Sequence, residues 1–166
     1  MKRVDAFGRF ATLVATALLL TACGVSAPAG PAPDGVAAQL LAQVNAERTA
    51  GRSCGARGAF APTHALVYEA RLGAAAQDHS DDMLARGTMS HTGGDGSNPG
   101  QRIARTGYEA ATWGENVAYG YASVDAVMAG WLGSDGHCAN LMNPGFTEFG
   151  AGESGRYWTQ KFARPR

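Results

Sequence analysis

The sequence has little charge of either sign and no run of basic residues. Only 17% of its 166 residues are charged, against about 25% in average soluble domains, and 14 basic residues balance 14 acidic ones. Lysine occurs only at Lys2 and Lys161. Proteins that hold nucleic acid by its phosphates need clustered positive charge. The composition therefore argues against a nucleic-acid partner.

The sequence also lacks the composition of a disordered chain. Hydrophobic residues make up 45%, which is enough to bury a core. The chain contains 23 Gly and 7 Pro, and this share, about 18%, exceeds the usual one of about 12% and indicates many turns. For a chain of this length we expect a single folded domain.

No apolar segment is long enough to form a membrane-spanning helix. The apolar segment near the N-terminus, Phe10 to Leu20, is too short, because spanning a bilayer takes about 20 residues. It follows a basic segment (residues 2–9) and precedes the residues LTAC, which end at Cys23. This is the pattern of an export signal. The small residues before Cys23 resemble the bacterial lipobox, in which the cysteine is lipidated and the signal is removed.

The chain is thus expected to have three parts. Residues 1–22 are a lipoprotein signal peptide, residues 23–34 are the lipidated Cys23 and a tether rich in Pro and Ala, and residues 35–166 are the folded domain. Two acyl chains suffice for stable anchoring. We therefore expect a monomer on the outer face of a bacterial membrane, or a secreted protein if an ordinary signal peptidase cleaves the chain and Cys23 is incidental.

Three cysteines are present, and setting Cys23 aside leaves Cys54 and Cys138. Outside the cytosol an oxidising environment favours a disulfide between them. Two buried free thiols are the first alternative. Metal ligation by the two thiols is the second, although no CxxC spacing accompanies them.

The periodicity of apolar residues predicts an α+β domain. The expected helices are 34–51, capped by Asp34, 63–87, 99–105 and 123–133. The expected strands are 113–121, 146–152 and 156–162, of which the last two form a hairpin over residues 153–155.

Polar motifs stand in Gly-rich surroundings in a definite order. They are SH at 90–91, GENVA at 114–118, a Trp followed by SDGH at 134–137, and YWTQKF at 157–162. In this order they resemble bacterial members of the CAP superfamily, which includes cysteine-rich secretory proteins, insect venom antigens and plant pathogenesis-related proteins. The resemblance covers about residues 40–162.

The resemblance implies an α-β-α sandwich in which two His and two Glu face a cleft reported to take zinc or another divalent cation. His91, Glu115 and His137 match three of these residues, but Ser134 stands where the second Glu is expected. Two imidazoles and one carboxylate can hold Zn²⁺ with an open position for water. The expected cleft also includes Ser90, Asn116 and Ser134.

Other interpretations of the same residues remain open. In one, the two histidines are hydrogen-bonded loop residues of a polar cleft, and His79 is a packing residue on the apolar face of the long helix. Asn116 is expected to bond loop backbone more readily than a ligand. Ser134, His137 and Glu115 also resemble a hydrolase triad, but no Gly-x-Ser-x-Gly elbow surrounds the serine.

These residues support three hypotheses about function. The first is a non-enzymatic module that binds a lipid, a sterol or an envelope component, because the resemblance ties relatives to such ligands. Its apolar groove would involve the region of Trp113, Tyr119, Tyr121 and Trp131, unless these aromatic residues belong to the core. The second is a metal-assisted hydrolase acting on envelope peptide or glycan. The third is a structural protein of the envelope.

Overall fold

The computed structural model describes residues 1, 33 and 35–166. Apart from Met1 and Pro33, the expected signal peptide and tether lie outside the described residues, and so do Cys23 and the expected helix cap Asp34. Among the described residues, no helix is both long and apolar enough to cross a membrane.

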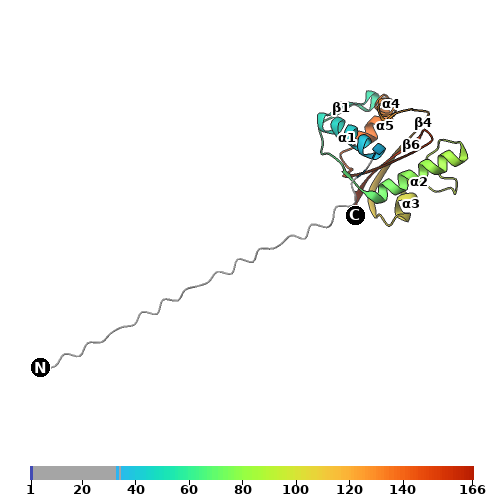
Figure 1. Cartoon of the computed structure of the whole chain (residues 1–166). Helices are drawn as coiled ribbons and strands as arrows, with labels where there is room; N and C mark the ends of the chain where they lie inside the picture. Colours follow the sequence, from blue (N-terminus) through green and yellow to red (C-terminus); the bar gives the residue numbers. More distant parts are fainter. Residues whose placement is uncertain (2–32, 34) are drawn as a thin grey trace.

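Helices and strands alternate irregularly along the described chain (Figure 1). In order they are α1 (Gly35–Ala50), β1 (Arg52–Ser53), the 3₁₀ helix η1 (Gly55–Arg57), β2 (Ala59–Phe60), β3 (Val67–Tyr68), α2 (Ala70–Arg86), α3 (Pro99–Arg105), β4 (Ala110–Tyr119), α4 (Val124–Leu132), α5 (Asp135–Met142), β5 (Glu148–Ser154) and β6 (Tyr157–Pro165). This arrangement confirms the predicted α+β class.

The main sheet has the strand order β3-β5-β6-β4. The pairs β5–β6 and β6–β4 are antiparallel, whereas β3 runs parallel to β5. The strand β4 lies at one edge of the sheet, and its Glu115 stands directly opposite Lys161 of β6. A separate small sheet joins β1 to β2.

Helices cover both faces of the main sheet, as Figure 1 shows. On one face, α2 lies so close to β5 that a Cβ atom on Gly150 would stand 2.7 Å from Leu72 Cβ and closer still to the backbone of Gly73. Neighbouring strand residues point to opposite faces. Accordingly Phe149 packs on the other side, in the core cluster that contains Leu40 of α1 and residues of α4 and α5. The expected α-β-α sandwich is therefore confirmed.

The helix α2 begins later than the sequence predicts. Residues 63–66 are not helical, Val67 pairs with Glu148 of β5, and Glu69 caps the helix by accepting a hydrogen bond from the Arg71 backbone N–H at 3.0 Å. The expected start near residue 63 was wrong because Val67 and Tyr68 form a strand instead. Their partner strand, β5, lies about eighty residues further along the chain, so the local apolar pattern does not reveal it. The expected end is confirmed, since Gly87 adopts a left-handed conformation after Arg86.

The remaining elements agree with the prediction to different degrees. The expected helices 34–51, 99–105 and 123–133 correspond to α1, α3 and α4, and the Ser123 side chain caps α4. Strand β4 begins three residues earlier than expected, and the β5–β6 turn lies at Gly155 and Arg156. The helix α5 and the strands β1, β2 and β3 were not predicted from the sequence.

A disulfide joins Cys54 to Cys138, with 5.5 Å between the Cα atoms. The predicted pairing is thus confirmed, and the alternatives of free thiols and thiol metal ligands were wrong. Beside it, Asp135 Oδ2 accepts a hydrogen bond from the Ala56 backbone N–H at 3.0 Å. Both links fasten α5 to the segment around η1.

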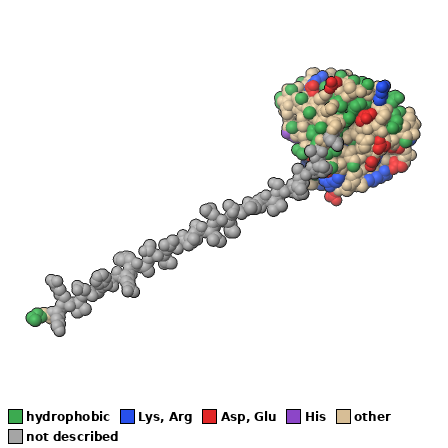
Figure 2. Space-filling model, in the orientation of Figure 1, with side chains coloured by type: hydrophobic (Ala, Val, Ile, Leu, Met, Phe, Trp, Pro, Cys, Tyr) green, Lys and Arg blue, Asp and Glu red, His purple; other side chains and the backbone are tan. Residues whose placement is uncertain are grey.

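Charged side chains are interspersed on the face of the domain shown in Figure 2, where acidic and basic groups lie among uncharged ones. This mixed surface is consistent with the balanced composition.

Candidate functional site

The candidate site lies at the β4 edge of the sheet. His91 lies in the loop between α2 and α3, Glu115 lies on β4, and His137 lies in the first turn of α5. Glu115 faces the α2 side of the sheet and Asn116 faces the α5 side, because adjacent strand residues point in opposite directions. His91 contacts β4 through its ring, at Glu115, whereas His137 contacts β4 through its backbone carbonyl, at Asn116.

Glu115 is the centre of a buried polar network. Its Oε1 lies 2.7 Å from His91 Nδ1. Its Oε2 accepts a hydrogen bond from Arg102 Nη2 at 2.9 Å and another from Lys161 Nζ. The Glu115 side chain is 1% exposed and that of Lys161 is fully buried. One carboxylate thus contacts two cations and one imidazole.

These contacts decide the charge of the carboxyl group. Burial by itself would raise the pKa of Glu115, but the hydrogen bond from His91 and the charges of Lys161 and Arg102 outweigh it and lower the pKa to about 2. Burial lowers the pKa of Lys161 to about 8, although the Glu115 carboxylate opposes this effect. At neutral pH Glu115 is therefore ionised and can only accept hydrogen bonds. It follows that His91 Nδ1 carries the hydrogen and donates it to Glu115.

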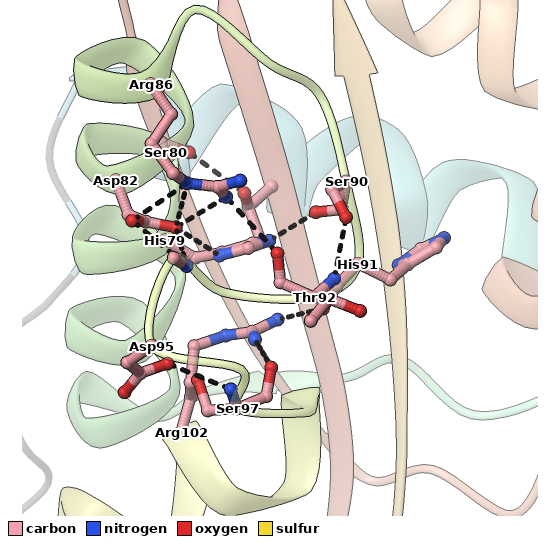
Figure 3. A network of polar contacts seen from close by, with 12 residues as sticks. His79, Ser80, Asp82, Arg86, Ser90, His91, Thr92, Asp95, Ser97 and Arg102 are labelled. Carbon is pink, nitrogen blue, oxygen red and sulfur yellow. Dashed lines mark hydrogen bonds and ion pairs between the residues drawn. The ribbon is translucent and has the colours of Figure 1, made fainter.

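His79 lies under the loop that carries His91 (Figure 3). It is fully buried on α2, and its Nε2 bonds the carbonyl oxygen of Ser90 at 2.8 Å. Its Nδ1 has no hydrogen-bond partner and lies 3.8 Å from Asp82 Oδ2. Burial lowers the pKa of His79. The interpretation of His79 as a packing residue that bonds backbone is confirmed.

Arg102 of α3 reaches toward the same loop (Figure 3). Its Nη1 donates to the carbonyl oxygen of Ser97 at 2.7 Å, and its Nη2 donates to that of His91 at 2.9 Å. The bond from Nη2 to Glu115 then links the loop to the sheet. Hydrogen bonds with His79 of α2, Arg102 of α3 and Glu115 of β4 therefore hold the loop segment around His91 in place.

Sequence reasoning missed Arg102 and Lys161. Lys161 is the only lysine of the expected domain and stands between Gln160 and Phe162 in a segment predicted to be a strand. A lysine in that setting is a signal of a buried ion pair, because lysine is almost never fully buried without a partner. No comparable local signal marks Arg102.

The α5 side of the site is built around Asn116, which is fully buried. Its Nδ2 donates to the carbonyl oxygen of His137 at 3.3 Å, and its Oδ1 accepts from Asn140 Nδ2 at 2.9 Å. Asn116 therefore bonds backbone, as expected, but the carbonyl group belongs to helix α5 and not to a loop. Burial lowers the pKa of His137, and His91 adds to the effect.

The two serines of the expected cleft lie at turns of the chain. Ser90 Oγ accepts a hydrogen bond from the Thr92 backbone N–H at 2.9 Å. Ser134 occupies the N-cap position of α5 without a capping bond from its side chain. The hydrolase interpretation needs a hydrogen bond between Glu115 and His137. Among the described residues Glu115 bonds His91 instead, and no hydrogen bond joins Glu115 to His137.

The described residues do not fit a three-ligand metal site in this arrangement. Among them, no three His, Cys, Asp or Glu side chains are placed so that they could hold a metal ion. Both oxygens of Glu115 already contact donors of the protein. The assignment of zinc or another divalent cation to His91, Glu115 and His137 stays a prediction.

A groove of about 260 Å³ lies beside His137. Its lining residues come from the loop before His91, from β4 and the turn after it, and from α4 and the start of α5: Met89, Val117, Ala118, Tyr119, Tyr121, Gly130, Trp131, Ser134 and His137. Met89, Tyr119 and Tyr121 are 50%, 56% and 36% exposed. The Tyr121 ring lies directly against Gly130, because a Cβ atom added to Gly130 would stand only 2.6 Å from Tyr121 Cζ.

The structure separates the four aromatic residues that the sequence analysis grouped. Tyr119, Tyr121 and Trp131 line the groove, although Trp131 is only 1% exposed and also belongs to the core. Trp113 is 43% exposed and lines a different depression beside α3, next to Gly100. The groove interpretation therefore holds for Tyr119, Tyr121 and Trp131, and the core interpretation holds for Trp131 as well.

The family model named CAP, the cysteine-rich secretory protein family, matches residues 41–162. The chain belongs to this family. The match spans α2, the polar network, β5 and residues 157–162 of β6, so it covers the elements that build the site.

Relatives of this CAP domain occur in bacteria. The chain is 34% identical over 99 residues to the uncharacterized protein YkwD of Bacillus subtilis, covering 58% of this chain and 38% of YkwD. It is 34% identical over 86 residues to the uncharacterized membrane protein YlbC of the same organism, covering 52% of this chain and 25% of YlbC. The segments that match this chain thus make up less than half the length of these relatives.

Solved structures share the CAP fold. An extracellular SCP-domain protein from Bacillus anthracis aligns with a TM-score of 0.70 and 28% identity, over 78% of this chain and 40% of that one. An outer surface protein from Borrelia burgdorferi aligns with a TM-score of 0.65 and 19% identity, over 76% of this chain and 90% of that one, and this likeness shows the fold alone.

Proposed function

We propose that this protein is an exported CAP-domain lipoprotein, anchored through Cys23 to the outer face of a bacterial membrane, that binds a lipid chain or a sterol without catalysis. The observation that carries the proposal is the groove beside His137, which is lined by Tyr119 and Tyr121, residues that are 56% and 36% exposed. Solved members of the fold include an extracellular protein and an outer surface protein, which supports the location outside the cytosol.

The groove has the chemistry of an apolar binding site with a polar rim. Tyrosine rings offer apolar surface at one end and a hydroxyl at the other. Exposed apolar groups that gather in one place commonly mark a binding site. A volume of about 260 Å³ suits part of an acyl chain or of a ring system, so the remainder of the ligand would lie outside. A tether of residues 23–34 would keep the domain within roughly 35 Å of the membrane.

The state of Glu115 favours binding over catalysis. A metal-assisted hydrolase would need a free carboxylate near the histidines, as a metal ligand or as a general base. Both oxygens of Glu115 are engaged by His91, Arg102 and Lys161 instead. Envelope hydrolysis and a purely structural role remain the alternatives that the binding experiment must separate.

The experiment is a titration of the protein with a fluorescent fatty acid and with a fluorescent sterol. Replacing Tyr119→Ser together with Tyr121→Ser should weaken binding about tenfold, or ~1.4 kcal/mol, because the apolar wall of the groove is lost. Trp113→Ser is the matched control, since this exposed aromatic residue lies outside the groove.

Equal weakening by the control, or no saturable binding of either probe, would contradict the proposal. Hydrolysis of envelope peptide or glycan that a chelator and Glu115→Gln each abolish would support the hydrolase instead. Mass measurement of the N-terminal peptide from membrane-extracted protein checks lipidation of Cys23.

A further inference from the structure

The carboxylate of Glu115 carries its own counter-ions. Lys161 Nζ and Arg102 Nη2 both donate to Oε2, and the side chains of Lys161 and Arg102 are 0% and 8% exposed. Lys161 projects from β6 directly across from Glu115 in the register of the sheet. The Lys161 ammonium group therefore lies where a bound cation would otherwise neutralise the charge of the Glu115 carboxylate.

The other oxygen is engaged in a way that concerns His91. The contact of Oε1 with His91 Nδ1 spans 2.7 Å, and His79 Nε2 lies 4.0 Å from the same oxygen. Because an ionised carboxylate has no hydrogen to give, Nδ1 of His91 donates. A proton thus occupies the space between Nδ1 and Oε1, and these two atoms cannot share a metal ion at the same time.

We propose that Glu115 is a positioning residue for His91, neutralised internally by Lys161 and Arg102, and is not a metal ligand of the cleft. Glu115 fixes the imidazole so that Nδ1–H points into the protein and Nε2 is the nitrogen left for a ligand. The His91 side chain as a whole is 54% exposed. A cation brought to Glu115 would meet two positive charges at contact distance, and like charges at that distance repel.

The first test uses the unaltered protein. Nitrogen-15 NMR of the metal-free chain at pH 7.5 should show His91 with hydrogen on Nδ1, and the Nδ1–H signal should persist in a tenfold molar excess of zinc. Hydrogen on Nε2 instead, or loss of the Nδ1–H signal as zinc binds in stoichiometric amount, would overturn the proposal. This readout reports the tautomer, which a merely structural role of Glu115 would not set.

The second test changes the internal cation. Lys161→Met keeps much of the side-chain length and removes the charge, so zinc affinity measured by calorimetry should rise at least tenfold. Lys161→Arg keeps the charge and should bind zinc no better than the unaltered protein. Unaltered protein that binds zinc as tightly as Lys161→Met, with binding lost in Glu115→Gln, would overturn the proposal. Circular dichroism establishes that each variant is folded.

Discussion

The buried charge of Glu115 is expected to stabilise the fold in a pH-dependent manner. In the folded protein its pKa is lowered from an ordinary 4.5 to about 2, because the contacts with His91, Lys161 and Arg102 outweigh the opposing effect of burial. A carboxyl group of this kind contributes its full stability above the unfolded-state pKa and loses it as the pH falls through the folded-state pKa. A pKa difference of this size corresponds to about 3 kcal/mol in the free energy of unfolding.

Glu115→Gln tests this expectation. At pH 7 the variant should be less stable than the unaltered protein by about 3 kcal/mol or more, because Lys161 and Arg102 remain buried without their counter-ion. The difference should shrink as the pH falls from about 4.5 toward 2, because the carboxyl group of the unaltered protein then becomes neutral as well. The assay is urea unfolding of both proteins at several pH values in the presence of a chelator. Comparing the proteins at each pH removes most of the contribution of the groups they share.

A stability difference that stays constant between pH 7 and pH 2 would refute the reasoning. It would mean that Glu115 stabilises the fold through shape and neutral hydrogen bonds rather than through charge. The control is Glu109→Gln, which removes an exposed carboxylate. This control should differ little from the unaltered protein at any pH in the series.

Two further changes test the packing that positions the site. Gly150→Ala should destabilise the protein by about 2–3 kcal/mol in urea unfolding, because the new Cβ atom would meet the backbone of α2, whereas Gly136→Ala, with no atom within 4 Å, should be neutral or slightly stabilising. A neutral Gly150→Ala would contradict the close approach of α2 to β5. Replacing both Cys54 and Cys138 by Ala should cost about 2–5 kcal/mol, and an unchanged melting temperature would mean that the disulfide adds nothing to the other contacts of α5.

Local sequence was sufficient where an element carries its own start and stop signals. Ser123 caps α4, Asn98 and Gln101 form a capping box at α3, and Gly87 ends α2 in a left-handed conformation. Each of these signals acts through the backbone of its own turn, so it can be recognised without knowledge of the rest of the chain.

Elements that depend on distant partners were missed. Val67 and Tyr68 become a strand only because β5 lies beside them, and the local apolar pattern had placed them in a helix. The short helix α5 has weak signals of its own. It is held by the disulfide at Cys138, by the contact of Asp135 with Ala56, and by Asn116.

For the candidate site, the sequence by itself determined which residues are present and, through the order of its motifs, to which family the chain belongs. It brought His91, Glu115 and His137 forward as a set and paired Cys54 with Cys138. The tertiary structure decided what Glu115 does. Lys161 is 46 residues away along the chain, and only the pairing of β4 with β6 brings its ammonium group to the carboxylate. Charge interactions depend on distance in space and on burial, and neither can be read from the order of residues along the chain.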